Sequence, residues 1–140
     1  MTVGYRYPDI NTPLTGRNAD PVTVTVGDGV ELASFMTRPE YQIDISARKI
    51  TLSNMRYPYP YSGYVVSTAP AAFNGFVFTL PSDSPVVFTG ASLGSGTRDA
   101  VNVGNSRITV APKQLTLNVS NTGYSESTVI DIDVFTAASN

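Results

Sequence analysis

Short segments of alternating apolar and polar residues, separated by turn-forming residues, recur along most of this chain. Residues 22–26 read Val-Thr-Val-Thr-Val, which puts three valines on one face of an extended strand and two threonines on the other. The same period of two returns at residues 41–45 and 49–52. A helix needs a period of 3.6, so this pattern restricts the chain to a fold built from sheets. Further strands are predicted at residues 64–67, 76–80, 86–89, 100–103, 107–110, 115–119 and 129–136.

About ten short strands at this spacing predict an all-β protein with one antiparallel β-sandwich. A single domain of 140 residues is large enough to bury a core without disulfides or a metal. Thirty Ser and Thr residues, eleven glycines and ten prolines agree with many strands and turns. A jelly-roll and an immunoglobulin-like arrangement both fit the pattern.

At most one or two short helices are expected. Residues 27–29 could close a hairpin onto a strand at 30–32. The alternative is a short helix, which we favour slightly because Asp28 and Glu31 form a capping-box pattern. Helical spacing follows at Leu32, Phe35 and Met36, before a stop at Pro39. One further helical turn is expected within residues 68–75.

The N-terminal residues 1–21 have no period of either kind and contain three prolines. We expect an extended N-terminal arm that cannot bury itself and that is held by the domain's own flank or by a neighbouring subunit. The β-sandwich domain is then expected to span residues 22–140.

The chain contains no histidine and no cysteine, which removes the side chains that most often serve acid–base, thiol and zinc chemistry. Residues 90–94 match the G-x-S-x-G nucleophile elbow, but that chemistry needs a histidine beside the serine. Residues 94–96 read Gly-Ser-Gly without a lysine to reach a phosphate. We therefore expect a glycine-rich loop at 90–99, no cofactor and no enzymatic activity.

Two carboxylates, Asp131 and Asp133, alternate with Ile130, Ile132 and Val134 and are expected on one outer strand face. Paired carboxylates can bind calcium, with Asp44 as a distant third candidate ligand. A cation site needs six or more oxygens from several segments, so we favour a solvated strand face and predict no metal.

Charge and hydropathy argue against two classes of partner, nucleic acids and membranes. The formal net charge is −2 and the nine cations are scattered, so no basic stripe is present to bind nucleic acid. No segment reaches the roughly 20 apolar residues that span a bilayer, and residues 1–8 show no secretion signal. Seven of the nine cations are Arg, the cation that is enriched at protein interfaces.

A tyrosine-proline run at residues 57–64 is the strongest candidate binding surface. Alternating Tyr and Pro favours an extended backbone that loses little entropy on binding. The tripeptide Arg-Tyr-Pro occurs twice, at 6–8 and 56–58, which suggests two contributions to one interface. The predicted interface residues are Tyr5, Arg6, Tyr7, Arg56, Tyr57, Tyr59, Tyr61 and Tyr64.

These features together favour a non-enzymatic structural protein of a virus particle. In size, composition and layout the chain resembles the small decoration or cement proteins on the outer shell of tailed bacteriophages. That resemblance implies a homo-oligomer, such as a trimer, bound to a larger capsid lattice in the virion and assembled in the host cytoplasm. The alternative is a carbohydrate- or receptor-binding module that uses the tyrosine cluster as a stacking platform for a glycan.

Overall fold

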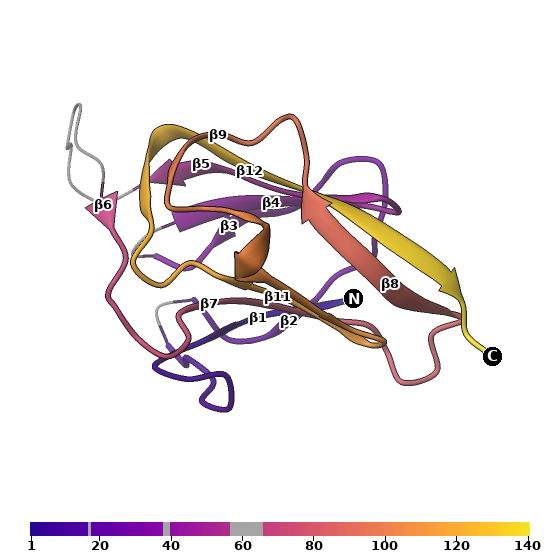
Figure 1. Cartoon of the computed structure of the whole chain (residues 1–140). Coiled ribbons are helices and arrows are strands. Elements are labelled where there is room, and N and C mark those ends of the chain that lie inside the picture. Colours follow the sequence, from indigo (N-terminus) through magenta and orange to yellow (C-terminus); the bar gives the residue numbers. More distant parts are fainter. Residues whose placement is uncertain (17, 38–39, 57–65) are drawn as a thin grey trace.

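Two antiparallel β-sheets pack face to face in this protein (Figure 1), which confirms the predicted β-sandwich. The structure is a computed structural model, and it describes residues 1–16, 18–37, 40–56 and 66–140. The strands are β1 (Thr2–Arg6), β2 (Val22–Thr23), β3 (Val30–Phe35), β4 (Glu40–Ser46), β5 (Lys49–Arg56), β6 (Val66–Ser67), β7 (Gly75–Thr79), β8 (Val86–Leu93), β9 (Arg98–Val101), β10 (Ile108–Ala111), β11 (Gln114–Asn118) and β12 (Gly123–Ala138).

The five-stranded sheet has the order β10-β11-β7-β1-β2, with the first strand of the chain in its interior. Strand β1 pairs with β7 over its whole length, so that Tyr5 lies opposite Phe76. Val3 is fully buried. The predicted separation of an N-terminal arm from the sandwich is therefore wrong for residues 2–6, because strand pairing with β7 supplies the partner that the local sequence does not reveal. Strand β2 covers only the first two of the five residues predicted there.

The seven-stranded sheet is organised around β12, a strand of 16 residues. One edge of β12 pairs with β5, which continues through β4 to β3. The other edge pairs with β8 and, near the start of β12, with β9. Strand β6 also joins the start of β12. Ile130, Ile132 and Val134 alternate inward from β12 and are buried, as their period of two predicts.

The short helix favoured near residues 28–36 is absent, and the segment forms strand β3 instead. The apolar positions that fit a helical period also fit this strand, because the register of β3 against β4 shifts on both sides of Leu32. Glu31 makes no capping box. Its carboxylate accepts the backbone N–H of Gly27 at 2.9 Å and that of Ile45 at 2.5 Å.

Residues 68–75 also form no helical turn. The Thr68 hydroxyl caps no helix and donates instead to the carbonyl of Val119. In the part of the chain that the structure describes, the only helical element is a 3-10 turn at Asn105–Arg107.

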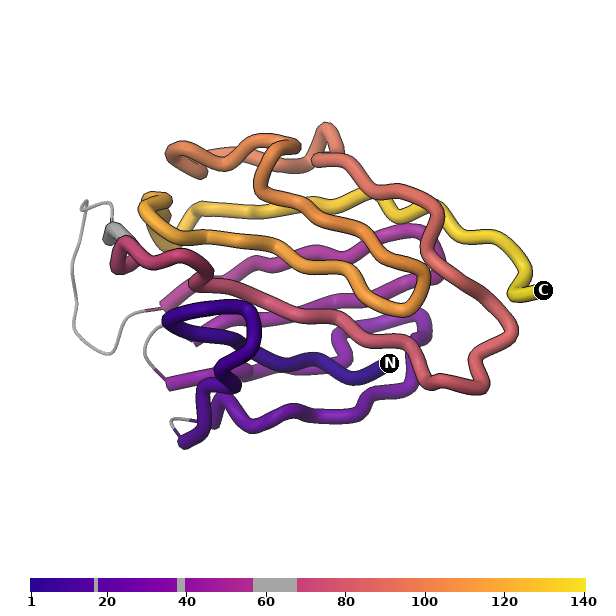
Figure 2. Tube along the Cα trace, turned by 60° about the horizontal axis from the view of Figure 1, so that its bottom comes forward, coloured from indigo at the N-terminus to yellow at the C-terminus, as the bar shows by residue number. Residues whose placement is uncertain are grey.

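A row of aromatic rings crosses the core near one end of the sandwich. The Phe76 ring packs edge-on against Tyr5, with centroids 4.9 Å apart, and against Tyr41, with centroids 4.8 Å apart. Tyr41 continues the row to Tyr124, the second residue of β12. These contacts tie the end of β1 to the beginnings of β4 and β12, and so define one end of the molecule. Strands β1 and β5 both finish at this end (Figure 2).

Candidate interaction surface

Tyr5 belongs to the core and not to the surface predicted from the repeated Arg-Tyr-Pro motif. Its side chain is buried, and its hydroxyl donates to Asn74 Oδ1 at 2.6 Å. Burial raises the pKa of this hydroxyl well above its ordinary value. Because the ring packs on Phe76, Tyr5 is not available to a partner, and its assignment to the interface is corrected.

The next residues form a small hydrogen-bonded loop with two exposed apolar side chains. The backbone N–H of Tyr7 donates to the carbonyl of Thr12 at 3.0 Å, which closes the loop. The Asp9 carboxylate accepts the backbone N–H of Asn11 at 2.9 Å and the Thr12 hydroxyl at 3.0 Å. Tyr7 and Ile10 remain 36% and 39% exposed. The loop therefore holds two apolar side chains in solvent on a fixed backbone.

Two arginines lie at the end of the sandwich that carries this loop. Arg6 ends β1, and its guanidinium Nη1 donates to the carbonyl of Ile10 at 3.4 Å. Arg56 ends β5 and is exposed, opposite Glu40 in the register of β4. Since β1 and β5 finish at the same end of the sandwich, the structure brings Arg6, Tyr7 and Arg56 to one end (Figures 1 and 2).

The same end carries a further exposed apolar residue that sequence reasoning missed. Val101, 46% exposed, lies opposite Gly123, the first residue of β12. We call this region, with Arg6, Tyr7, Ile10, Arg56 and Val101, the Tyr7 end. The predicted interface residues Tyr57, Tyr59, Tyr61 and Tyr64 lie outside the described residues.

The pair Asp131 and Asp133 does not form the solvated face that alternation predicted. Asp131 is buried, and its carboxylate accepts Lys49 Nζ at 2.8 Å and Thr51 Oγ1 at 3.0 Å. The hydrogen bond to Asp131, followed by the negative charge of that carboxylate, raises the pKa of Lys49. Asp133 lies further away, 3.6 Å from the same ammonium.

The segment between β8 and β9 covers Asp131, which explains its two glycines. A Cβ atom on Gly94 would lie 2.8 Å from Asp131 Oδ2, and one on Gly96 would lie 2.6 Å from it. The Thr97 hydroxyl donates to the Asp131 carbonyl and accepts its N–H, each at 3.0 Å. The glycine spacing that resembles a phosphate loop thus permits close approach of backbone to a buried carboxylate.

The G-x-S-x-G match at residues 90–94 lacks the geometry of a nucleophile elbow, and the Asp131 and Asp133 pair lacks that of a metal site. Ser92 lies within β8, opposite Asp133 in β12, and not on the strained strand-to-helix turn of a nucleophile elbow. The residues that the structure describes contain no group of three or more acidic, His or Cys side chains placed to hold a metal ion. The Lys49 ammonium occupies the position that a cation would take beside Asp131.

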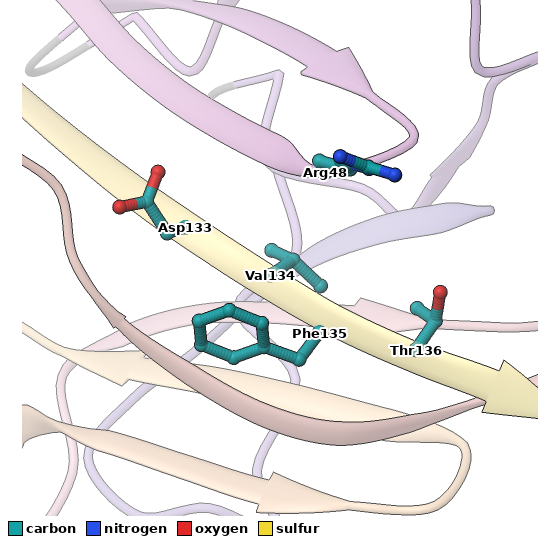
Figure 3. A pocket seen from close by; sticks show the side chains of 5 residues that line it. All are labelled: Arg48, Asp133, Val134, Phe135 and Thr136. Carbon is teal, nitrogen blue, oxygen red and sulfur yellow. The ribbon is translucent and has the colours of Figure 1, made fainter.

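A second surface feature lies at the opposite end of the sandwich and was not predicted. Arg48, in the turn between β4 and β5, and residues 133–136 of β12 line a hollow of about 420 Å³ (Figure 3). Phe135 is 55% exposed there. We call this the Phe135 hollow.

In comparisons with known proteins, no family model, no curated protein and no solved structure matched this chain. Among the described residues, no helix is both long enough and apolar enough to cross a membrane. The structure therefore defines only the class, a β-sandwich that carries exposed apolar and arginine side chains at both ends.

Proposed function

We propose that this chain is a non-enzymatic structural protein of a virus particle, a capsid decoration protein of a tailed bacteriophage that binds the outer shell through its Tyr7 end. The observation that carries the proposal is the closed loop of residues 7–12, which presents Tyr7 and Ile10 beside Arg6. Tyrosine and arginine are the residues that most often dominate protein–protein binding energy.

Preorganisation favours a binding role for this loop. The hydrogen bonds around Asp9 fix the backbone before any partner arrives, so little conformational entropy is lost on association. Val101 and Arg56 lie at the same end of the sandwich, on β9 and β5 of the other sheet. The interface that we expect is a docking site on the shell, with the tyrosine-proline run of residues 57–64 as its second contribution.

The alternative function uses Tyr57, Tyr59, Tyr61 and Tyr64 as a stacking platform for a glycan. These tyrosines lie outside the described residues, so no observed geometry favours this alternative over the docking site.

The proposal is tested by cosedimentation of the purified chain with capsid shells of the virus whose genome encodes it. Tyr7→Ala should weaken shell binding about tenfold, the effect of losing one central aromatic contact. Val30→Ala is the matched control, because Val30 is 44% exposed but lies opposite Asp44, near the other end of the sandwich. Equal binding of the wild-type chain and of Tyr7→Ala would reject the Tyr7 end as the docking site.

The native mass, measured by size-exclusion chromatography with light scattering, tests self-association separately. A defined oligomer, such as a trimer, is the expected state of a decoration protein that also contacts its own copies. A monomer that still binds shells would show that the chain contacts the capsid lattice but not its own copies. A monomer without shell binding would refute the proposed function.

A further inference from the structure

Phe135 is the most exposed large apolar side chain that the structure describes, at 55%. It lies opposite Gly90 of β8, and a Cβ on that glycine would lie 3.4 Å from Phe135 Cδ2. Because Gly90 has no side chain, the ring rests against the β8 backbone while much of its surface stays in solvent. An aromatic ring in this position has the geometry of a stacking platform.

Two residues of opposite charge, Asp133 and Arg48, also line the Phe135 hollow, with Arg48 on the other side of β12 from the ring in the view of Figure 3. Asp133 projects from β12, with its side chain 42% exposed. Arg48 comes from the β4–β5 turn, which is fixed to β12 because the Val134 N–H donates to the Arg48 carbonyl at 2.8 Å. Among the described residues, no carboxylate lies within ion-pair distance of the Arg48 guanidinium. Its five N–H donors are therefore available to a ligand.

The chemistry of these groups selects a neutral ligand with many hydroxyls. Because Arg48 and Asp133 carry opposite charges, the lining gives neither an anion nor a cation a net attraction. A wholly apolar ligand would remove water from Arg48 and Asp133 without replacing their hydrogen bonds. A sugar has hydroxyls that donate to the carboxylate and accept from the guanidinium, and an apolar C–H face that covers an aromatic ring.

We propose that the Phe135 hollow is a saccharide-binding subsite for one neutral pyranose unit of a glycan. The ring of Phe135 stacks on the sugar, Arg48 donates to its hydroxyls, and Asp133 accepts from them. The hollow, about 420 Å³, is large enough to hold one hexose unit. Thr136 adds a hydroxyl to the lining (Figure 3).

This site is separate from the docking surface at the Tyr7 end. It is built from the β4–β5 turn and the C-terminal half of β12, while the docking surface is built from the ends of β1 and β5. The two proposals therefore fail independently. A variant that loses sugar binding should still bind shells, and a variant that loses shell binding should still bind sugar.

The test is a nuclear magnetic resonance titration of the ¹⁵N-labelled full chain with the methyl glycosides of glucose, galactose, mannose and N-acetylglucosamine. We expect at least one of them to shift the amides of residues 48 and 133–136 in a saturable way at millimolar concentration. Phe135→Ala should weaken that binding about tenfold, since the buried ring face is lost. Phe135→Tyr should retain it.

Val101→Ala is the matched control, because Val101 is also exposed, at 46%, but lies at the Tyr7 end. It should leave the titration unchanged. A thermal melt of each variant shows whether it is folded. The proposal is overturned if none of the four glycosides shifts these amides, if the shifts map to the Tyr7 end, or if folded Phe135→Ala binds as the wild type does.

Discussion

The segment between β8 and β9, which covers Asp131, allows a quantitative prediction for Gly96 and Asp131, two positions far apart in the sequence. In the Gly96→Ala variant, the new Cβ would meet Asp131 Oδ2 at 2.6 Å, much closer than real atoms approach. We expect the variant to lose about 1–3 kcal/mol of unfolding free energy, the usual cost of forcing an extra carbon into a packed site. Asp131→Ala alone should cost about 1.5–3 kcal/mol through the loss of the hydrogen bond that its carboxylate accepts from Thr51.

The double variant should lose less than the sum of the two single losses. Once Asp131 is alanine, the nearest remaining atom of that residue is its Cβ, 3.3 Å from the new carbon, which a small loop shift accommodates. The coupling between the two substitutions should therefore recover about 1–2 kcal/mol. Urea unfolding of the four proteins, analysed by linear extrapolation, measures it.

Gly104 is the control position, because a Cβ there has no atom within 4 Å and its backbone is extended. Gly104→Ala should show no coupling to Asp131→Ala. Losses at Gly96 and Asp131 that add to within about 0.5 kcal/mol would refute the close approach of the loop to the carboxylate.

Three further predictions follow from the core and the strand pairing. Gly75→Ala should cost at least about 3 kcal/mol in urea unfolding, because its Cβ would lie 1.9 Å from the Leu117 carbonyl oxygen; a wild-type midpoint would contradict the pairing of β7 with β11. Ser120→Ala should cost about 1–3 kcal/mol, measured in the same way, because the buried Ser120 hydroxyl accepts the Ala71 N–H at 2.8 Å and the alanine leaves that donor unpaired. Burial raises the pKa values of Tyr5 and Tyr41 above 10.0, so the folded state keeps both protons where the unfolded state loses them. Stability should be unaffected by these groups below pH about 10 and fall above it, by up to about 1.4 kcal/mol per pH unit for each tyrosine. Urea unfolding across that pH range measures the fall, and a Tyr5→Phe slope equal to that of the wild type would contradict its assignment to Tyr5.

The sequence predicted those strands in which apolar and polar residues alternate within a few consecutive positions. Residues 41–45 and 129–136 are local patterns of period two, and both lie in strands. Strand β1 could not be recognised in this way, because its burial depends on pairing with β7, about seventy residues later. The segment at β3 was misjudged because register shifts in the strand place apolar residues at helical spacing.

The candidate sites were predictable to a smaller extent. Arg6, Tyr7 and Arg56 of the repeated Arg-Tyr-Pro motif lie at one end of the sandwich, and their joint interface stays a prediction. Tyr5 is buried because side chains alternate between the two faces of β1. The Phe135 hollow depends on Arg48, which lies 85 residues or more from the other lining residues, so no local pattern indicates it. The burial of Asp131 could have been suspected from the glycines of residues 94–96, since closely spaced glycines often permit close backbone approach.

The position of β12 has a consequence for synthesis of the protein. When a ribosome has produced residues 1–122, every strand of the five-stranded sheet exists, but the other sheet lacks the strand that joins β5 to β8. The apolar inner faces of both halves then remain exposed, with unpaired strand edges that favour aggregation. The nascent chain therefore depends on its last strand to close the core, and a cell that makes this protein rapidly must protect that intermediate until β12 emerges.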